Sequence, residues 1–225
     1  MVQGTPAGKL WVHGSDHAPC GSLPLTVMAD ALLLNLWFPT FTASEMMPRT
    51  LSVLRQFPFS ASQPGISYLA IHPVAWGEPT VLERRFRPGL EPESAMAIAA
   101  EFLHSDYAYV WETHWDLWMP GDSDSEDFHL APVQVKIITH GLDFEEHAYQ
   151  QAGHLQVDFG LDTSFLGEEE LLAATTEGRV RANVQRLVAF TGAVEKNCGI
   201  TGRVLWSESD ENLAQKLIEL LQRVQ

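Results

Sequence analysis

The sequence is poor in cysteine and in basic residues. Its 225 residues include two cysteines, Cys20 and Cys198, and neither belongs to a CxxC motif or a zinc-finger pattern. Two distant cysteines are typical of reduced thiols in a cytosolic protein, with one long-range disulfide as the alternative. Lysine and arginine total 14 against 29 acidic residues, so the formal net charge is −15. This balance argues against nucleic acids and anionic membranes as partners, because both attract basic surfaces. It would suit a basic partner or a cation.

Long apolar runs and the common nucleotide and protease motifs are also missing. The longest apolar run, residues 31–38, is too short to span a bilayer, and residues 1–14 contain no apolar core of a secretory signal. We therefore expect a cytoplasmic protein without a membrane span. The chain has no GxGxxG, GxxxxGK[ST], HExxH or GxSxG pattern. Dinucleotide binding by the usual loop, phosphate cradling, zinc-protease chemistry and the hydrolase nucleophile elbow therefore lose support.

Aromatic residues are concentrated in one stretch, residues 107–120, with the sequence YAYVWETHWDLWMP. It holds three of the seven tryptophans. As a β-strand it would place its bulky side chains on one face, because successive side chains alternate between the faces of a sheet. The predicted core face holds Tyr109, Trp111, Thr113, Trp115 and Leu117, and the opposite face holds Glu112, His114, Asp116 and Trp118. The second set is either a solvated or interface-facing row, or the floor of a ligand or metal site.

The remaining pattern predicts an α+β protein. From residue 32 to residue 118 the expected order is βαββαβ, which is the ferredoxin-like order. The rest of the chain is expected to read ββαβα, ending in an amphipathic helix that begins near Ser209. We predict a mainly antiparallel sheet with helices on one face. The expected units are residues 1–120 and 121–225, with residues 121–131 as the boundary, or both units packed as one continuous domain.

A second candidate site is the segment HGLDFEEH, which follows a predicted strand. It contains the metal-ligand candidates His140, Asp143, Glu145 and His147. Imidazole and carboxylate groups are common ligands of zinc, manganese and non-haem iron. If the two strands are neighbours, Glu112, His114 and Asp116 would join this cluster. The alternative is a polar hairpin loop whose charges face water.

Three functional hypotheses follow. The favoured one is a non-catalytic binding or regulatory module that recognises a protein partner, a small molecule or a second copy of itself. The alternative is a metal-dependent enzyme, such as a hydrolase, that uses a divalent metal at residues 140–147. The third is a small-molecule carrier with an aromatic pocket lined by Trp111 or Trp115. The sequence alone leaves open whether the protein is an enzyme.

Overall fold

The structure, a computed structural model, describes residues 31–121, 128–166 and 174–207. Within these residues seven strands form a single sheet in the order β3-β2-β4-β5-β6-β1-β7, and every neighbouring pair is antiparallel. The helix predicted from Ser209 lies outside the described residues. The strands are β1 (Ala31–Trp37), β2 (Ile66–Pro73), β3 (Leu82–Arg85), β4 (Tyr107–Pro120), β5 (Phe128–His140), β6 (Leu155–Leu161) and β7 (Gly202–Ser207).

The helices begin and end close to their sequence signals. Thr42 and Glu45 have the sequence spacing of a capping box, and at the start of α1 (Ala43–Leu54) the Glu45 carboxylate accepts the Thr42 N–H at 3.0 Å. Pro92 occupies the first turn of α2 (Pro92–Ala100), where its missing N–H costs no hydrogen bond. The other helical segments are η1 (Phe144–Glu146), α3 (Tyr149–Ala152), α4 (Thr163–Leu166) and α5 (Ala174–Asn197).

The mixed α and β composition and the mainly antiparallel sheet are confirmed, but the ferredoxin-like topology is not. That topology would pair the strands of the first half with one another. Instead β1 lies between β6 and β7, where Leu34 is opposite both Val157 and Leu205. The apolar side chains of β1 are buried on the helix-covered face whichever strands lie beside it, so its composition did not reveal its neighbours. Strands from both expected units therefore belong to one sheet, with β1 of the first unit placed between β6 and β7 of the second.

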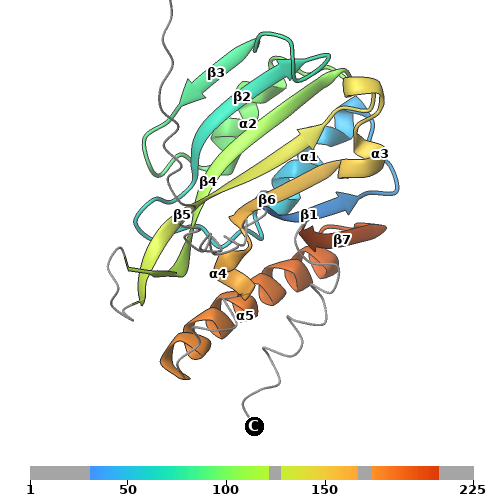
Figure 1. Cartoon of the computed structure of the whole chain (residues 1–225). Helices are drawn as coiled ribbons and strands as arrows, with labels where there is room; N and C mark the ends of the chain where they lie inside the picture. Colours follow the sequence, from blue (N-terminus) through green and yellow to red (C-terminus); the bar gives the residue numbers. More distant parts are fainter. Residues whose placement is uncertain (1–30, 122–127, 167–173, 208–225) are drawn as a thin grey trace, which may run out of the picture.

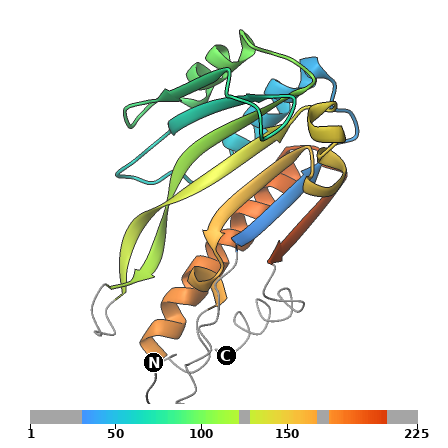
Figure 2. The same ribbon diagram turned by 45° about the horizontal axis from the view of Figure 1, so that its top comes forward.

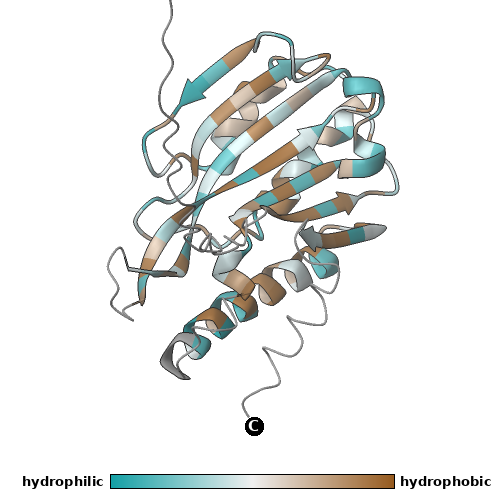
Figure 3. Cartoon of the chain, viewed as in Figure 1, coloured by the Kyte–Doolittle hydropathy of each residue, from teal (hydrophilic) through white to brown (hydrophobic). Residues whose placement is uncertain are grey.

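The three longer helices, α1, α2 and α5, lie on the same side of the sheet (Figures 1 and 2). We call this side the inner face and the opposite side the outer face. Along the strands apolar and polar residues alternate, as the colours of Figure 3 show, because each strand has one buried face. On β4 the predicted core row is buried, with Trp111 at 0% and Trp115 at 1% exposure.

The long strand β4 changes partners along one edge. β2 pairs with β4 only as far as Thr113, opposite Ile66. Beyond that point Ser60 donates its N–H to the His114 carbonyl at 2.8 Å, and Arg186 from α5 donates to the Asp116 carbonyl. The Asn183 side chain then accepts the Trp118 N–H and donates to the Trp118 carbonyl, both at 2.9 Å. Helix α5 is thereby fixed against an edge that would otherwise have unpaired backbone groups.

Candidate functional site

The outer face of the sheet carries a row of side chains that crosses five strands. Backbone pairing places Arg85 opposite Tyr68, Tyr68 opposite Glu112, Glu112 opposite Lys136, and Lys136 opposite Asp158. We call these five residues the outer row. Adjacent strands lie about 4.8 Å apart, so opposite charges alternate at close spacing from β4 to β6. Arg85 also lies over the Tyr68 ring, 5.0 Å from its centroid.

The row predicted along β4 divides according to what its side chains contact. Glu112 belongs to the outer row, and His114 follows it opposite Gln134. Burial lowers the pKa of His114 against the raising effect of Glu112, and its Nδ1 is buried without a hydrogen-bond partner among the described residues. Asp116 and Trp118 lie farther along the strand, where the chain contacts other segments.

At that end two side chains are engaged by neighbouring segments. The Asp116 carboxylate accepts the Ala61 N–H at 3.0 Å, and the Arg179 guanidinium lies 5.3 Å from the centroid of the Trp118 ring. Burial raises the pKa of Asp116, but hydrogen bonds from Ser60 and Ala61 and the charge of Arg186 outweigh it and lower the pKa overall. All four side chains of the predicted row are half-buried, and Asp116 and Trp118 are the two that contact the 60–61 segment and α5.

Three of the four residues predicted as metal ligands make hydrogen bonds to other groups of the protein. His140 is 2% exposed, and its Nδ1 lies 2.9 Å from the Gly153 carbonyl. Asp143 accepts the Ser105 hydroxyl at 2.6 Å, and Nδ1 of His147 lies 2.6 Å from the Leu142 carbonyl. Glu145 is exposed to solvent.

Nor does the structure bring the β4 residues to this loop. His114 pairs with Gln134, six residues before His140 on β5, which corresponds to about 20 Å along a strand. Within the described residues, no group of three or more His, Cys, Asp or Glu side chains is placed to hold one metal ion. Metal binding at residues 140–147 therefore stays a prediction.

Backbone strain gathers where this loop meets the turn after β2. Four non-glycine residues of the described chain have positive φ, namely Val74, Glu145, Glu146 and His147. The Glu145 N–H donates to the Val74 carbonyl at 2.7 Å, so all four lie together. We call the segments 74–76 and 141–153 the strained corner. Strain of this kind persists only where the surroundings enforce it and is often found at functional sites. No sequence signal marked Val74.

Aromatic and imidazole rings pack beneath the strained corner. Trp76, which is 37% exposed, lies with its ring centroid 4.9 Å from that of His72 and 5.1 Å from that of Phe144. His154 stacks between Phe41 and Tyr149, at 4.5 and 4.9 Å, and its Nδ1 accepts the Phe38 N–H at 3.0 Å.

These contacts keep the buried imidazoles neutral. Burial, and secondarily the nearby His140, lower the pKa of His154 to about 4. Burial also lowers the pKa of His72 and of His140. A neutral imidazole is a weaker general acid than a protonated one, so a lowered pKa makes these side chains weak proton donors near pH 7.

Comparison of this chain with protein-family models, with curated proteins and with solved structures gives no match. None of the helices in the described part of the chain combines the length and apolar character needed to cross a bilayer.

Proposed function

We propose that the protein is a non-catalytic binding module that recognises a partner protein on the outer face of its sheet. The observation that carries this proposal is the outer row, in which charges of both signs alternate on a face that no long helix covers within the described residues. Lys136 and Arg85 are exposed, and Tyr68, Glu112 and Asp158 are half-buried. A patterned charged surface of this kind gives orientation and specificity to a protein contact.

The strained corner would supply the apolar part of the contact. Trp76 is 37% exposed and Val74 is 53% exposed, side by side at one end of the outer face. Exposed Glu145 and Glu146 stand close to them. Tryptophan is enriched among the residues that dominate binding energy, and acidic flanks favour a basic partner. The net charge of −15 supports the same choice of partner.

A charge exchange tests the proposal without altering net charge. In the double variant Glu112→Lys/Lys136→Glu, the cross-strand pair is kept but its two charges exchange places, which also brings the new carboxylate at position 136 opposite Asp158. Arg55→Glu/Glu93→Arg is the matched control, because this ion pair, 3.0 Å between N and O, joins α1 and α2 on the inner side. The experiment is affinity capture from the native lysate with quantitative mass spectrometry, followed by titration of the purified partner.

We expect one basic protein to be captured by the wild type and by the control, and lost by the outer-row variant. Like-charge contacts across an interface cost several kcal/mol, so the affinity should fall by about 100-fold or more. Light scattering tests for self-association, which would contradict the choice of a basic partner because the chain itself has a net charge of −15. Retention of the partner by a folded outer-row variant would contradict the proposal, as would a strict monomer that captures nothing specifically.

A further inference from the structure

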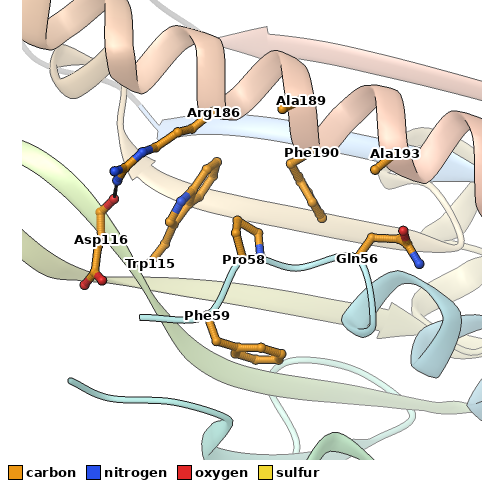
Figure 4. Close-up of a pocket in the computed structure, with 9 residues that line it drawn as sticks. All are labelled: Gln56, Pro58, Phe59, Trp115, Asp116, Arg186, Ala189, Phe190 and Ala193. Carbon is orange, nitrogen blue, oxygen red and sulfur yellow. Dashed lines mark hydrogen bonds between the residues drawn. The ribbon is translucent and has the colours of Figure 1, made fainter. Parts of the chain in front are cut away.

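A cavity of about 370 Å³ opens on the helix side of the sheet, away from the outer face (Figure 4). It lies between α5 and the segment that follows α1, at the point where the edge of β4 passes from β2 to α5. Its volume falls within the range of small-molecule sites in proteins. Its apolar lining consists of Pro58, Phe59, Trp115, Ala189, Phe190 and Ala193.

The aromatic walls of the cavity are fixed by their own packing. Phe57, which lies behind them, has its ring centroid 5.3 Å from Phe59, 5.7 Å from Trp115 and 5.5 Å from Phe190. These edge-to-face contacts restrict the motion of the rings. A ligand would therefore bind without the entropy cost of ordering these side chains. Space is left because α5 presents small side chains, Ala189 and Ala193, at positions one turn apart.

The polar groups of the cavity are mainly hydrogen-bond donors. Arg186 uses one N–H on the Asp116 carbonyl, and within the described residues its guanidinium forms no ion pair. Figure 4 shows the Asp116 carboxylate directed away from that guanidinium, and it accepts the Ala61 N–H instead. The Gln56 carbonyl oxygen accepts from Asn197 at 2.8 Å, which leaves the Gln56 amide N–H groups free of that contact.

We propose that this cavity binds a small planar aromatic molecule that carries a carboxylate. The ring would contact Phe59, Trp115 and Phe190, and the carboxylate would accept hydrogen bonds from the unused N–H groups of Arg186. A planar guanidinium matches a carboxylate in shape and charge, and such charge-assisted bonds are about twice as strong as neutral ones. The site lies on the opposite side of the sheet from the outer row. Ligand binding in the cavity can therefore be tested independently of partner binding.

The net charge of −15 does not prevent binding of an anion here. At physiological ionic strength charges more than about 8 Å away are largely screened. The acidic residue among those that line the cavity is Asp116, whose carboxylate is already held by the 60–61 segment. The guanidinium of Arg186, which would contact the ligand directly, therefore makes the cavity favour an anion.

The test is calorimetric titration of the full chain with naphthalene-2-carboxylate and with its neutral isostere, naphthalene-2-carboxamide. We expect the carboxylate to bind with a Kd below about 1 mM and about tenfold more tightly than the carboxamide. Arg186→Gln should reduce carboxylate binding to the carboxamide level, and Ala193→Leu should abolish binding of both by filling the cavity. Arg179→Gln and Gln185→Leu, on the same helix but outside the cavity, should bind like the wild type.

The proposal is overturned if neither probe binds, if the carboxamide binds as tightly as the carboxylate, or if folded Ala193→Leu binds normally. Equal losses in Arg186→Gln and Arg179→Gln would also overturn it, because they would reflect only the loss of a positive charge. Thermal unfolding of each variant is measured in parallel. Should Arg186→Gln fail to fold, Arg186→Lys keeps the charge without the forked geometry and should retain the preference for the carboxylate with weaker binding.

Discussion

At the scale of single residues, Asn183 has the most consequential position in the described chain. Its side chain is fully buried, and its amide completes the backbone pairing of Trp118 in the way that a neighbouring strand would. The same amide also donates to the Ser164 carbonyl at 2.9 Å, ahead of α5 in the chain. One side chain therefore joins β4, α4 and α5.

We predict that Asn183→Leu lowers the free energy of unfolding by about 2–4 kcal/mol. Leucine has a similar volume, so the loss arises because the Trp118 N–H and the Trp118 and Ser164 carbonyls lose their partner. Urea unfolding followed by tryptophan fluorescence measures the change. Gln185→Leu, an exposed position two residues along the same helix, should change stability by less than about 0.5 kcal/mol. Equal effects at the two positions would contradict the assignment.

At the scale of elements, the turn after β2 and the loop after β5 hold each other in strained conformations. Val74 has φ of 60°, which is unusual for any residue with a Cβ and more so for a β-branched one. Its N–H donates to the Asp106 carbonyl at 2.7 Å, and its carbonyl accepts from Glu145. These backbone bonds fix the conformation regardless of the side chain.

Val74→Gly should therefore stabilise the protein, by about 0.5–1 kcal/mol. Glycine removes the strain of a left-handed conformation, roughly 1–2 kcal/mol, and this exceeds the entropy that it adds to the unfolded chain. Val81→Gly is the control, because Val81 is similarly exposed, at 42%, but has no positive φ. That variant should be destabilised by about 1 kcal/mol. Chemical denaturation compares the two, and destabilisation of both would show that Val74 bears no strain.

Most elements could be predicted from the sequence, but their neighbours could not. The alternation in residues 107–118 identified the buried and the outward sides of β4, and Thr42 with Glu45 marked the start of α1. Such signals are local, so they fix an element and its buried face. Strand order depends on which partner covers each edge. Leu36 pairs with Leu155 and with Arg203, more than one hundred residues away, and no local pattern encodes that choice.

The candidate site shows the same limit. Glu112 was identified as an outward residue from its place on the strand. That Lys136 and Asp158 lie beside it could not be predicted, because their alignment depends on the register of β4, β5 and β6. The proposed convergence of His114 with His140 required a different register. The cavity beside Arg186 was invisible in the sequence apart from Trp115, because it is formed by segments 56–59, 115–116 and 186–193.

At the scale of the whole molecule, stability should fall as the solution becomes mildly acidic. The folded-state pKa of His154 is about 4, below its ordinary value of 6.5, so the unfolded chain takes up a proton first. The contribution is complete above pH 6.5 and is lost between pH 6.5 and 4. His72, His114 and His140, whose pKa values burial also lowers, act in the same direction.

From pH 7.5 to pH 5, His154 alone should account for a loss of about 2 kcal/mol in the free energy of unfolding. Carboxyl groups have ordinary pKa values of about 4, so most of the excess negative charge is kept over this range and relief of its repulsion is the smaller effect. Urea midpoints at several pH values measure the change. His154→Gln should flatten the dependence, and His129→Gln, at an exposed position, should not. A stability that is constant or rises toward pH 5 would contradict the neutral state of these imidazoles.

The position of β1 between β6 and β7 also has a consequence for biosynthesis. β1 is translated more than one hundred residues before the residues that flank it, such as Val157 and Leu205 beside Leu34. At about 5–20 residues per second, this run of leucines waits on the order of 10 s before its partners exist. During that interval the nascent chain exposes an apolar segment, so heterologous expression should benefit from co-expressed chaperones that cover such segments.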